Sequence, residues 1–280
     1  MSKPRILLAN DDGIMAPGLR TLADALRERC ELWIVAPDRE RSATSHSISL
    51  HKPLRIRQIA PREFSVDGTP TDCVYMAVNH LMRDPPDLVV SGINDGPNLG
   101  NDVLYSGTVS AAMEGALFGH RALAVSMCLP AQPTGLPTPP AAFAAAVDVT
   151  VQLIDAVRGQ PMPAGVVLNI NVPFGGREAL RGIKLCRLGY TDWADAVTER
   201  RDPRGKPYYW IGGERLGHDA IADSDNNAVA AGYVSMVPIH YDMTDYRSFA
   251  YARGLEVAGL ARAPDGLGEQ SLPHPVRLKG

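Results

Sequence analysis

The sequence contains little cysteine and has no marked excess of either charge. Its 280 residues include four cysteines that lie far apart and form no CxxC pair: Cys30, Cys73, Cys128 and Cys186. This spacing argues against a zinc site or a redox dithiol, and we expect buried thiols in a cytoplasmic protein. The formal net charge of -3 does not suggest a binder of nucleic-acid polymers, because such proteins are usually clearly basic.

Long apolar runs and several familiar motifs are also missing. The apolar stretches are interrupted well short of a membrane span, and the N-terminus leads directly into an apolar run, so we expect neither a membrane anchor nor a signal peptide. There is no GxxxxGK[ST] motif and no GxGxxG after the first expected strand, which argues against a P-loop or a dinucleotide site. No Gly-x-Ser-x-Gly nucleophile motif occurs, and the adjacent acids Asp11 and Asp12 do not match the Asp-x-Asp of aspartyl-phosphate phosphatases.

What is present is an alternation of strand-like and helix-like segments. Strands are expected at residues 6–9, 31–36, 87–91, 122–127, 166–172 and 233–239, and helices at 19–26, 69–81, 108–118 and 143–157. Thr69 and Pro70 have the residue types that begin a helix. A strand at 54–59 alternates apolar and polar residues, so one of its faces should contact water. The pattern predicts an α/β fold with a doubly wound, mainly parallel, Rossmann-like sheet.

The composition changes after Gly189, which divides the chain into an expected catalytic core at 1–189 and a C-terminal region at 190–280. The segment from Tyr190 to Gly217 is rich in aromatic residues, charges and glycines, and has an Asp-Pro-Arg-Gly turn at 202–205. It predicts an extended hairpin or arm. The late strand and a polar, loosely held tail from Ala261 to Gly280 follow, and we expect this region to support oligomerisation and to complete the site.

Polar clusters follow several of the expected strands. They are residues 10–13, residues 36–42, residues 91–100, and residues 105–108 at the start of a helix. Because the carboxyl ends of parallel strands meet at one edge of a sheet, these clusters should converge there. The two adjacent carboxylates repel each other unless a cation lies between them, and hard oxygen donors suit Mg²⁺ or Mn²⁺. The helix start favours an anion. Taken singly, each cluster also fits an ordinary polar turn or helix cap.

Among the seven histidines, His240 is the best candidate for a site, because it ends the late strand two residues before Asp242. His46 and His51 lie in or beside the second polar cluster, and the others are expected to be structural or exposed.

Five stretches together resemble the survival protein SurE family of metal-dependent nucleoside monophosphate phosphatases. They are ILLANDDGI, APDRERSATSHSISL, GTPTDCVY, DLVVSGINDGPNLGNDVLYSGTVSAAMEG and AVAAGYVSMVPIHYDMT, which extend to about residue 245. The resemblance implies a 5'-nucleotidase, with 3'-monophosphates as a further substrate class, and one divalent ion per subunit, Mg²⁺ or Mn²⁺. It also implies homodimers or homotetramers that exchange their C-terminal arms.

The resemblance assigns roles by position in these motifs. The metal ligands would be Asp11, Asp12, Ser42 and Asn94. The phosphate-binding residues would be Asn98, Ser106, Gly107 and Thr108. Asp242 would assist proton transfer, so that the catalytic residues would be Asp11, Asp12 and Asp242. Many relatives have a histidine four residues after that last acid, where this chain has Tyr246.

Three alternatives remain open from the sequence. The chain could be a broad phosphomonoesterase or a short-chain exopolyphosphatase, or a non-catalytic nucleotide-binding regulator. A covalent aspartyl-phosphate route is the mechanistic alternative to direct attack by water. Asn10 adjoins the two acids, where it could orient them or touch the substrate.

Overall fold

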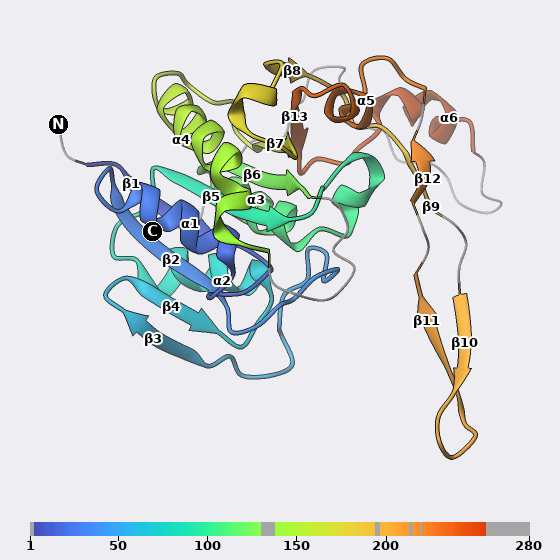
Figure 1. Ribbon diagram of the computed structural model, residues 1–280, viewed down its shortest axis with the longest axis horizontal. Coiled ribbons are helices and arrows are strands. Elements are labelled where there is room, and N and C mark those ends of the chain that lie inside the picture. The colour runs from blue at the N-terminus through green and yellow to red at the C-terminus, as the bar shows by residue number, and fades with distance from the viewer. Residues whose placement is uncertain (1–2, 130–137, 194–196, 213–214, 219, 256–280) are drawn as a thin grey trace.

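The computed structural model describes residues 3–129, 138–193, 197–212, 215–218 and 220–255. Its centre is a nine-stranded sheet in the order β3-β4-β2-β1-β5-β6-β7-β13-β8 (Figure 1). The strands are β1 (Arg5–Ala9), β2 (Glu31–Pro37), β3 (Ile56–Ala60), β4 (Glu63–Val66), β5 (Leu88–Asp95), β6 (Arg121–Cys128), β7 (Val166–Pro173), β8 (Ile183–Leu185) and β13 (Val234–His240). The β3–β4 and β7–β13 pairs are antiparallel and the other pairs are parallel. The predicted doubly wound, mainly parallel sheet is confirmed.

Helices cover both faces of this sheet. The longer ones are α1 (Pro17–Leu26), α2 (Pro70–Met76), α3 (Gly107–Leu117) and α4 (Ala144–Arg158), and the shorter ones are α5 (Asp225–Ala230) and α6 (Phe249–Arg253). Helices α1 and α4 pack together on one face, and α2 and α3 on the other. The chain adds strands to one side of β1 and then, from β5 onward, to the other side. The carboxyl ends of β1 and β5 therefore flank the topological switch point, where such sheets bind ligands.

Local sequence explains where several elements begin and end. Thr69 caps α2 as predicted: its hydroxyl accepts from the Asp72 amide at 3.1 Å, while the Asp72 carboxylate accepts from the Thr69 amide at 2.8 Å. The helix continues to Leu81 as predicted, although the α-helix ends at Met76 and its last part, Ala77–Leu81, is π-helical. Strands β4 and β8 were not predicted, since four and three residues are too few to show a periodic pattern.

The expected arm is present as one hairpin with two separate antiparallel ladders. Strands β10 (Val197–Arg201) and β11 (Pro207–Ile211) pair antiparallel, as do β9 (Thr191–Trp193) and β12 (Arg215–His218). The β10–β11 hairpin projects from the body (Figure 1). The boundary at Gly189 stays a prediction, although β13, from beyond it, lies within the main sheet. The tail from Ala261 to Gly280 lies outside the described residues.

One helical stretch is longer than the interrupted apolar runs that we expected from the sequence. Within the described residues, Pro140–Arg158 is long and apolar enough to cross a membrane by length and composition. In the fold, a 3₁₀ turn at Pro140–Phe143 leads into α4, whose residues Val149, Leu153 and Ile154 are buried in the main core. This burial is typical of a core helix of an α/β fold.

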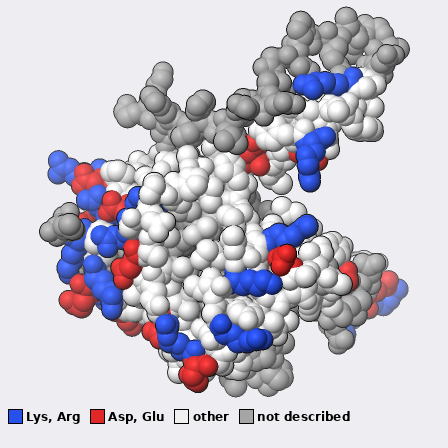
Figure 2. Space-filling view, turned by 90° about the horizontal axis from the view of Figure 1, so that it is seen from above, with Lys and Arg blue, Asp and Glu red and all other residues white. Residues whose placement is uncertain are grey.

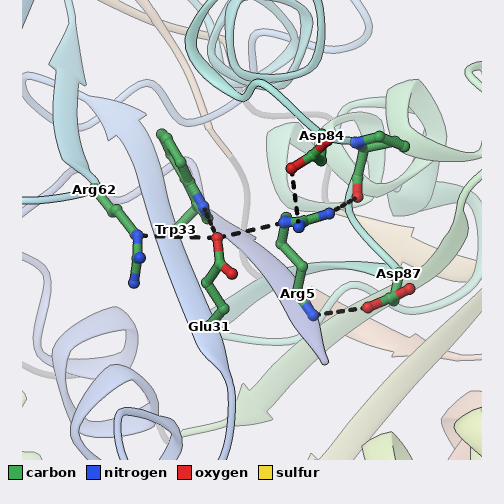
Figure 3. Close-up of polar contacts among 7 residues, drawn as sticks. Arg5, Glu31, Trp33, Arg62, Asp84 and Asp87 are labelled. Carbon is green, nitrogen blue, oxygen red and sulfur yellow. Dashed lines mark hydrogen bonds and ion pairs between the residues drawn. The ribbon is translucent and has the colours of Figure 1, made fainter. Parts of the chain in front are cut away.

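The amino ends of the central strands are joined by charged residues. Glu31 of β2 accepts from Arg5 of β1 at 3.3 Å and from the Trp33 indole at 3.2 Å, and Arg62 lies 3.9 Å away (Figure 3). The Asp87 carboxylate accepts from the Arg5 amide at 2.7 Å, ahead of β5. Figure 2 shows basic and acidic side chains intermingled at the end of the molecule where β1 begins. This edge lies opposite the carboxyl edge, and we interpret its contacts as structural.

A buried carboxylate also joins α1 to β4, and it predicts a pH-dependent loss of stability. Glu63 accepts from Arg20 at 2.9 Å and from Arg27 at 2.6 Å. Burial tends to raise the pKa of Glu63, but the hydrogen bonds from Arg27 and Arg20 outweigh it and lower this pKa below 4.5. The ion pairs of Glu63 with Arg20 and Arg27 therefore stabilise the fold above pH 4.5. This stabilisation is lost as the pH falls through the folded-state pKa of Glu63.

We expect Glu63→Gln to lower the free energy of unfolding at pH 7 by about 1–3 kcal/mol. Urea unfolding at pH 7 and at pH 3.5 measures the difference, which should shrink at the lower pH. The exposed Glu28→Gln is the matched control. A pH-independent difference would contradict this account of Glu63.

Candidate active site

The carboxyl edge of the sheet at the switch point forms a pocket of about 1350 Å³. The loops after β1, β2 and β5 line it, together with the start of α3 and the base of the β10–β11 hairpin. Its lining includes Asp11, Asp12, Glu40, Ser42, Asn94, Asp95, Asn98, Asp102, Tyr105, Ser106, Val197 and Ile211. The structure thus brings together residues from all the polar clusters identified in the sequence.

Asp11 and Asp12 leave β1 in a tight turn. Gly13 has a φ of +103°, which favours glycine, and the Asn10 side chain closes the turn by accepting from the Gly13 amide at 3.2 Å and donating to its carbonyl at 3.0 Å. Asn10 is fully buried, so its contacts give it a structural role in the acidic turn. The backbone amide of Arg41 donates to the Asp11 carbonyl at 2.7 Å, which holds the loop after β2 beside this turn.

Both acids are held in surroundings that disfavour their charge. Asp11 is only 4% exposed, and burial raises its pKa although Thr108 donates a hydrogen bond to it. Burial and then the charge of Asp11 raise the pKa of Asp12 to about 7. The Asp12 carboxylate accepts from the Asp95 amide at 3.2 Å. A buried and a half-buried carboxylate that repel each other are greatly stabilised by a cation between them.

Asn94 and Ser42 place further oxygen atoms in the same pocket. The Asn94 amide group donates to the Gly96 carbonyl at 2.8 Å, and its oxygen lies 3.2 Å from the Thr108 hydroxyl. The Ser42 hydroxyl donates to Glu40 at 2.8 Å. The oxygen donors expected from the sequence therefore converge, and they are hard ligands of the kind that divalent cations prefer.

The start of α3 faces the acids directly. The Ser106 hydroxyl caps the helix by accepting from the Val109 amide at 3.0 Å. A Cβ atom on Gly107 would lie 2.7 Å from the Asp11 Cβ and 2.8 Å from its Oδ2, so only glycine leaves Asp11 where it is. The Thr108 hydroxyl is directed at Asp11, which makes it a partner of the carboxylate rather than an evident phosphate donor. The sequence did not indicate this contact.

Asn98 is held by three buried polar residues that the sequence analysis did not single out. Asn171 of β7 accepts from the Asn98 amide at 2.8 Å and donates to its carbonyl at 3.0 Å. Asn169 donates to the same carbonyl at 2.9 Å, and the Asn98 side chain donates to Ser126 of β6 at 2.8 Å. The available signal was the pair of asparagines two apart in an otherwise apolar strand, which places both on one face.

We expect Asn171→Ala to reduce the activity of the site by about tenfold or more and to cost about 1–3 kcal/mol of stability, because it leaves the buried Asn98 amide without a partner. Phosphate release and thermal unfolding measure the two effects. Asn79→Ala, at an exposed asparagine that donates to the Tyr75 carbonyl, is the control. Wild-type activity in Asn171→Ala would contradict a positioning role.

Asp242, Tyr246 and His240 lie apart from this pocket. Asp242 and His240 line a second pocket of about 860 Å³, which shares no lining residue with the first in the described part of the chain. The Asp242 carboxylate accepts from Thr244 and from the Tyr246 hydroxyl, and these hydrogen bonds lower its pKa. His240 Nδ1 accepts from the Asp242 amide at 2.8 Å. Asp242 therefore does not line the pocket that contains Asp11 and Asp12, and its role stays a prediction.

The electrostatics of the first pocket call for a bound cation. Its described lining includes five carboxylates, those of Asp11, Asp12, Glu40, Asp95 and Asp102. No Lys, Arg or His is among the described lining residues. A phosphate dianion entering such a pocket would meet no positively charged side chain among the described lining residues. The residues present thus fit a divalent metal ion, which would neutralise both the carboxylates and an anionic ligand.

Comparisons with known proteins identify the family of this chain. The family described as Survival protein SurE matches residues 6–195. A protein named 5'-nucleotidase SurE from Anaeromyxobacter dehalogenans (strain 2CP-C) is 51% identical over 263 residues, covering 93% of this chain and 99% of that protein. Its namesake from Myxococcus xanthus is 47% identical over 95% of this chain and 99% of its own length. The crystal structure of SurE from Aquifex aeolicus, 39% identical, superposes with a TM-score of 0.77 over 89% of this chain and 98% of that one. On this evidence, the chain belongs to the SurE family.

Proposed function

We propose that this protein is a 5'-nucleotidase, a metal-dependent phosphatase that converts nucleoside 5'-monophosphates to nucleoside and phosphate. The observation that carries the proposal is the pocket at the switch point, which combines five carboxylates with a helix N-terminus and lacks basic side chains in its described lining. The names of the similar proteins support the same activity.

In this proposal Asp11, Asp12, Asn94 and Ser42 hold one divalent ion, Mg²⁺ or Mn²⁺. When bound, the ion supplies charge neutralisation and polarisation of the phosphoryl group, and lowers the pKa of water. Thr108 keeps Asp11 oriented by donating to its carboxylate, and Asn94 keeps its oxygen toward the site because its amide group is bonded to Gly96.

The start of α3 provides the second half of the proposed site. Backbone N–H groups at a helix N-terminus and the positive end of the helix dipole favour a phosphate group. Gly107 lets this helix approach Asp11, and Ser106 and Asn98 line the same pocket. We therefore retain Asn98, Ser106, Gly107 and Thr108 as phosphate-binding residues, with the Thr108 side chain supporting Asp11. Asp242 remains the candidate for proton transfer.

Phosphate release tests the proposal. We expect purified protein to release phosphate from nucleoside 5'-monophosphates with Mg²⁺ or Mn²⁺, and to lose this activity in EDTA. The panel should include 3'-monophosphates, simple phosphomonoesters and tripolyphosphate. For tripolyphosphate, the most negatively charged of these, the five carboxylates of the pocket predict weaker turnover. Nucleotide binding without phosphate release at saturating Mn²⁺ would instead support a regulator.

We also propose a homodimer or homotetramer in the cytoplasm. The β10–β11 hairpin carries a row of exposed aromatic side chains outside the pocket lining, Tyr208, Tyr209 and Trp210, which suits contact with a second copy. The four cysteines, all of which the structure describes, form no disulfide, as is usual in a reducing compartment. Sedimentation analysis of the purified protein measures the oligomeric state.

A further inference from the structure

We propose that Tyr105, Val197 and Ile211 form a wall that holds the nucleobase of the substrate, referred to below as the base wall. This inference rests on the proposed function, because it assigns the other end of the molecule whose phosphate the pocket is proposed to bind. The base wall would allow the protein to distinguish a nucleotide from other phosphomonoesters.

The pocket has a buried polar floor, and three large side chains with apolar surface lie among its exposed lining residues, beside the exposed acids Glu40 and Asp95. At the floor, Asp11 and Ser106 are buried. At the mouth, the side chains of Tyr105 and Val197 are each 65% exposed, and that of Ile211 is 93% exposed. A phosphate seated at the floor directs the rest of its ester toward the mouth, where these three side chains lie.

Tyr105 is well placed to contact the substrate beyond its phosphate. It immediately precedes Ser106, the cap of α3, and its backbone is fixed on both sides. The Tyr105 amide donates to the Asp102 carbonyl at 3.0 Å, and the Tyr105 carbonyl accepts from the Ser45 amide at 3.2 Å. An exposed aromatic ring on a fixed backbone loses little entropy when it stacks against a planar base.

Val197 and Ile211 come from the base of the hairpin and face the same pocket. They are directly opposite each other in the antiparallel β10–β11 pair, so their side chains share one face of the hairpin. Residues 198–210 extend away from the body in the rest of the hairpin (Figure 1). The hairpin thus brings two aliphatic side chains to the pocket that also contains Tyr105.

The chemistry of the base wall predicts broad base recognition. Two aliphatic side chains and the face of one ring offer contact area but no directional hydrogen bonds, apart from the Tyr105 hydroxyl. Stacking tolerates every base because every base has a π-face. We therefore expect purines and pyrimidines to be accepted, with purines favoured by their larger area.

The test compares adenosine 5'-monophosphate with ribose 5-phosphate, which lacks the base, at saturating Mn²⁺. The measured quantity is the ratio of their kcat/KM values. We expect this ratio to fall about tenfold in Tyr105→Ala and several-fold in Ile211→Ser, and to be retained in Tyr105→Phe. Tyr209→Ala, an exposed aromatic of the same hairpin outside the pocket lining, should keep the wild-type ratio.

An unchanged ratio in Tyr105→Ala would overturn the base wall, whether both kcat/KM values stay the same or fall equally. Calorimetric titration with adenosine separates this inference from the proposed function. Adenosine binding that weakens about tenfold in Tyr105→Ala supports the base wall even if the protein releases no phosphate, a result that would refute the nucleotidase proposal. Phosphate release without adenosine binding would support the nucleotidase proposal and refute the base wall.

Discussion

Replacing Asp11 by asparagine is expected to reduce metal-dependent phosphate release by about a thousandfold, equivalent to roughly 4 kcal/mol of transition-state stabilisation. The substitution removes a carboxylate that is buried beside Asp12 and fixed by Thr108. Asparagine preserves the shape of the side chain, so the loss of activity would come from the missing charge rather than from packing. Steady-state rates with Mn²⁺ measure the effect.

A matched control and a second readout make this prediction specific. Asp95→Asn removes a carboxylate from the same pocket, one that accepts from Thr138, and should cost less than tenfold in rate. In EDTA, the unfolding temperature of Asp11→Asn should equal or exceed that of wild type, because burial disfavours the native charge. Undiminished activity in Asp11→Asn would remove this residue from the site.

The second large effect is expected from Gly107→Ala. In a helix, alanine normally replaces glycine with a gain in stability of about 1 kcal/mol. Here the added methyl group would lie 2.7 Å from the Asp11 Cβ, so the carboxylate or the start of α3 must move. We expect a loss of activity of about a hundredfold or more, and a stability loss of about 1–3 kcal/mol.

Gly159→Ala is the control for this substitution. Gly159 ends α4 with a right-handed helical backbone, and a Cβ atom there would meet only ordinary contacts, the nearest at 3.5 Å. Its activity should match that of wild type. A Gly107→Ala protein that keeps wild-type activity would show that close approach of α3 to Asp11 is not required.

The sequence predicted the elements whose pattern is carried by many neighbouring residues. Strands β1, β2, β5, β6, β7 and β13 and helices α1 to α4 follow from buried apolar runs and helical spacing, whereas α5 was not predicted. The same logic predicted that Asp11, Ser42 and Asn94 meet, because each follows a strand and the strand ends share one edge. Their functional roles rest on the resemblance and stay predictions.

What could not be predicted depends on pairs that are remote in sequence. Asn171 holds Asn98 across 73 residues, and although its spacing from Asn169 places both on one face of β7, nothing local shows which residue they contact. The direction of the Thr108 hydroxyl, toward Asp11 across 97 residues, depends on the exact seating of α3. Val197 and Ile211 line the pocket because the β10–β11 hairpin begins and ends beside it, a placement without periodic signal.

The central claim is that the acidic pocket holds one divalent cation through Asp11 and Asp12, and direct metal binding tests it most simply. Calorimetric titration of the metal-free protein with Mn²⁺ should give one site per chain in the wild type and no measurable site in the double variant Asp11→Asn, Asp12→Asn. Equal Mn²⁺ binding by both proteins would contradict the account.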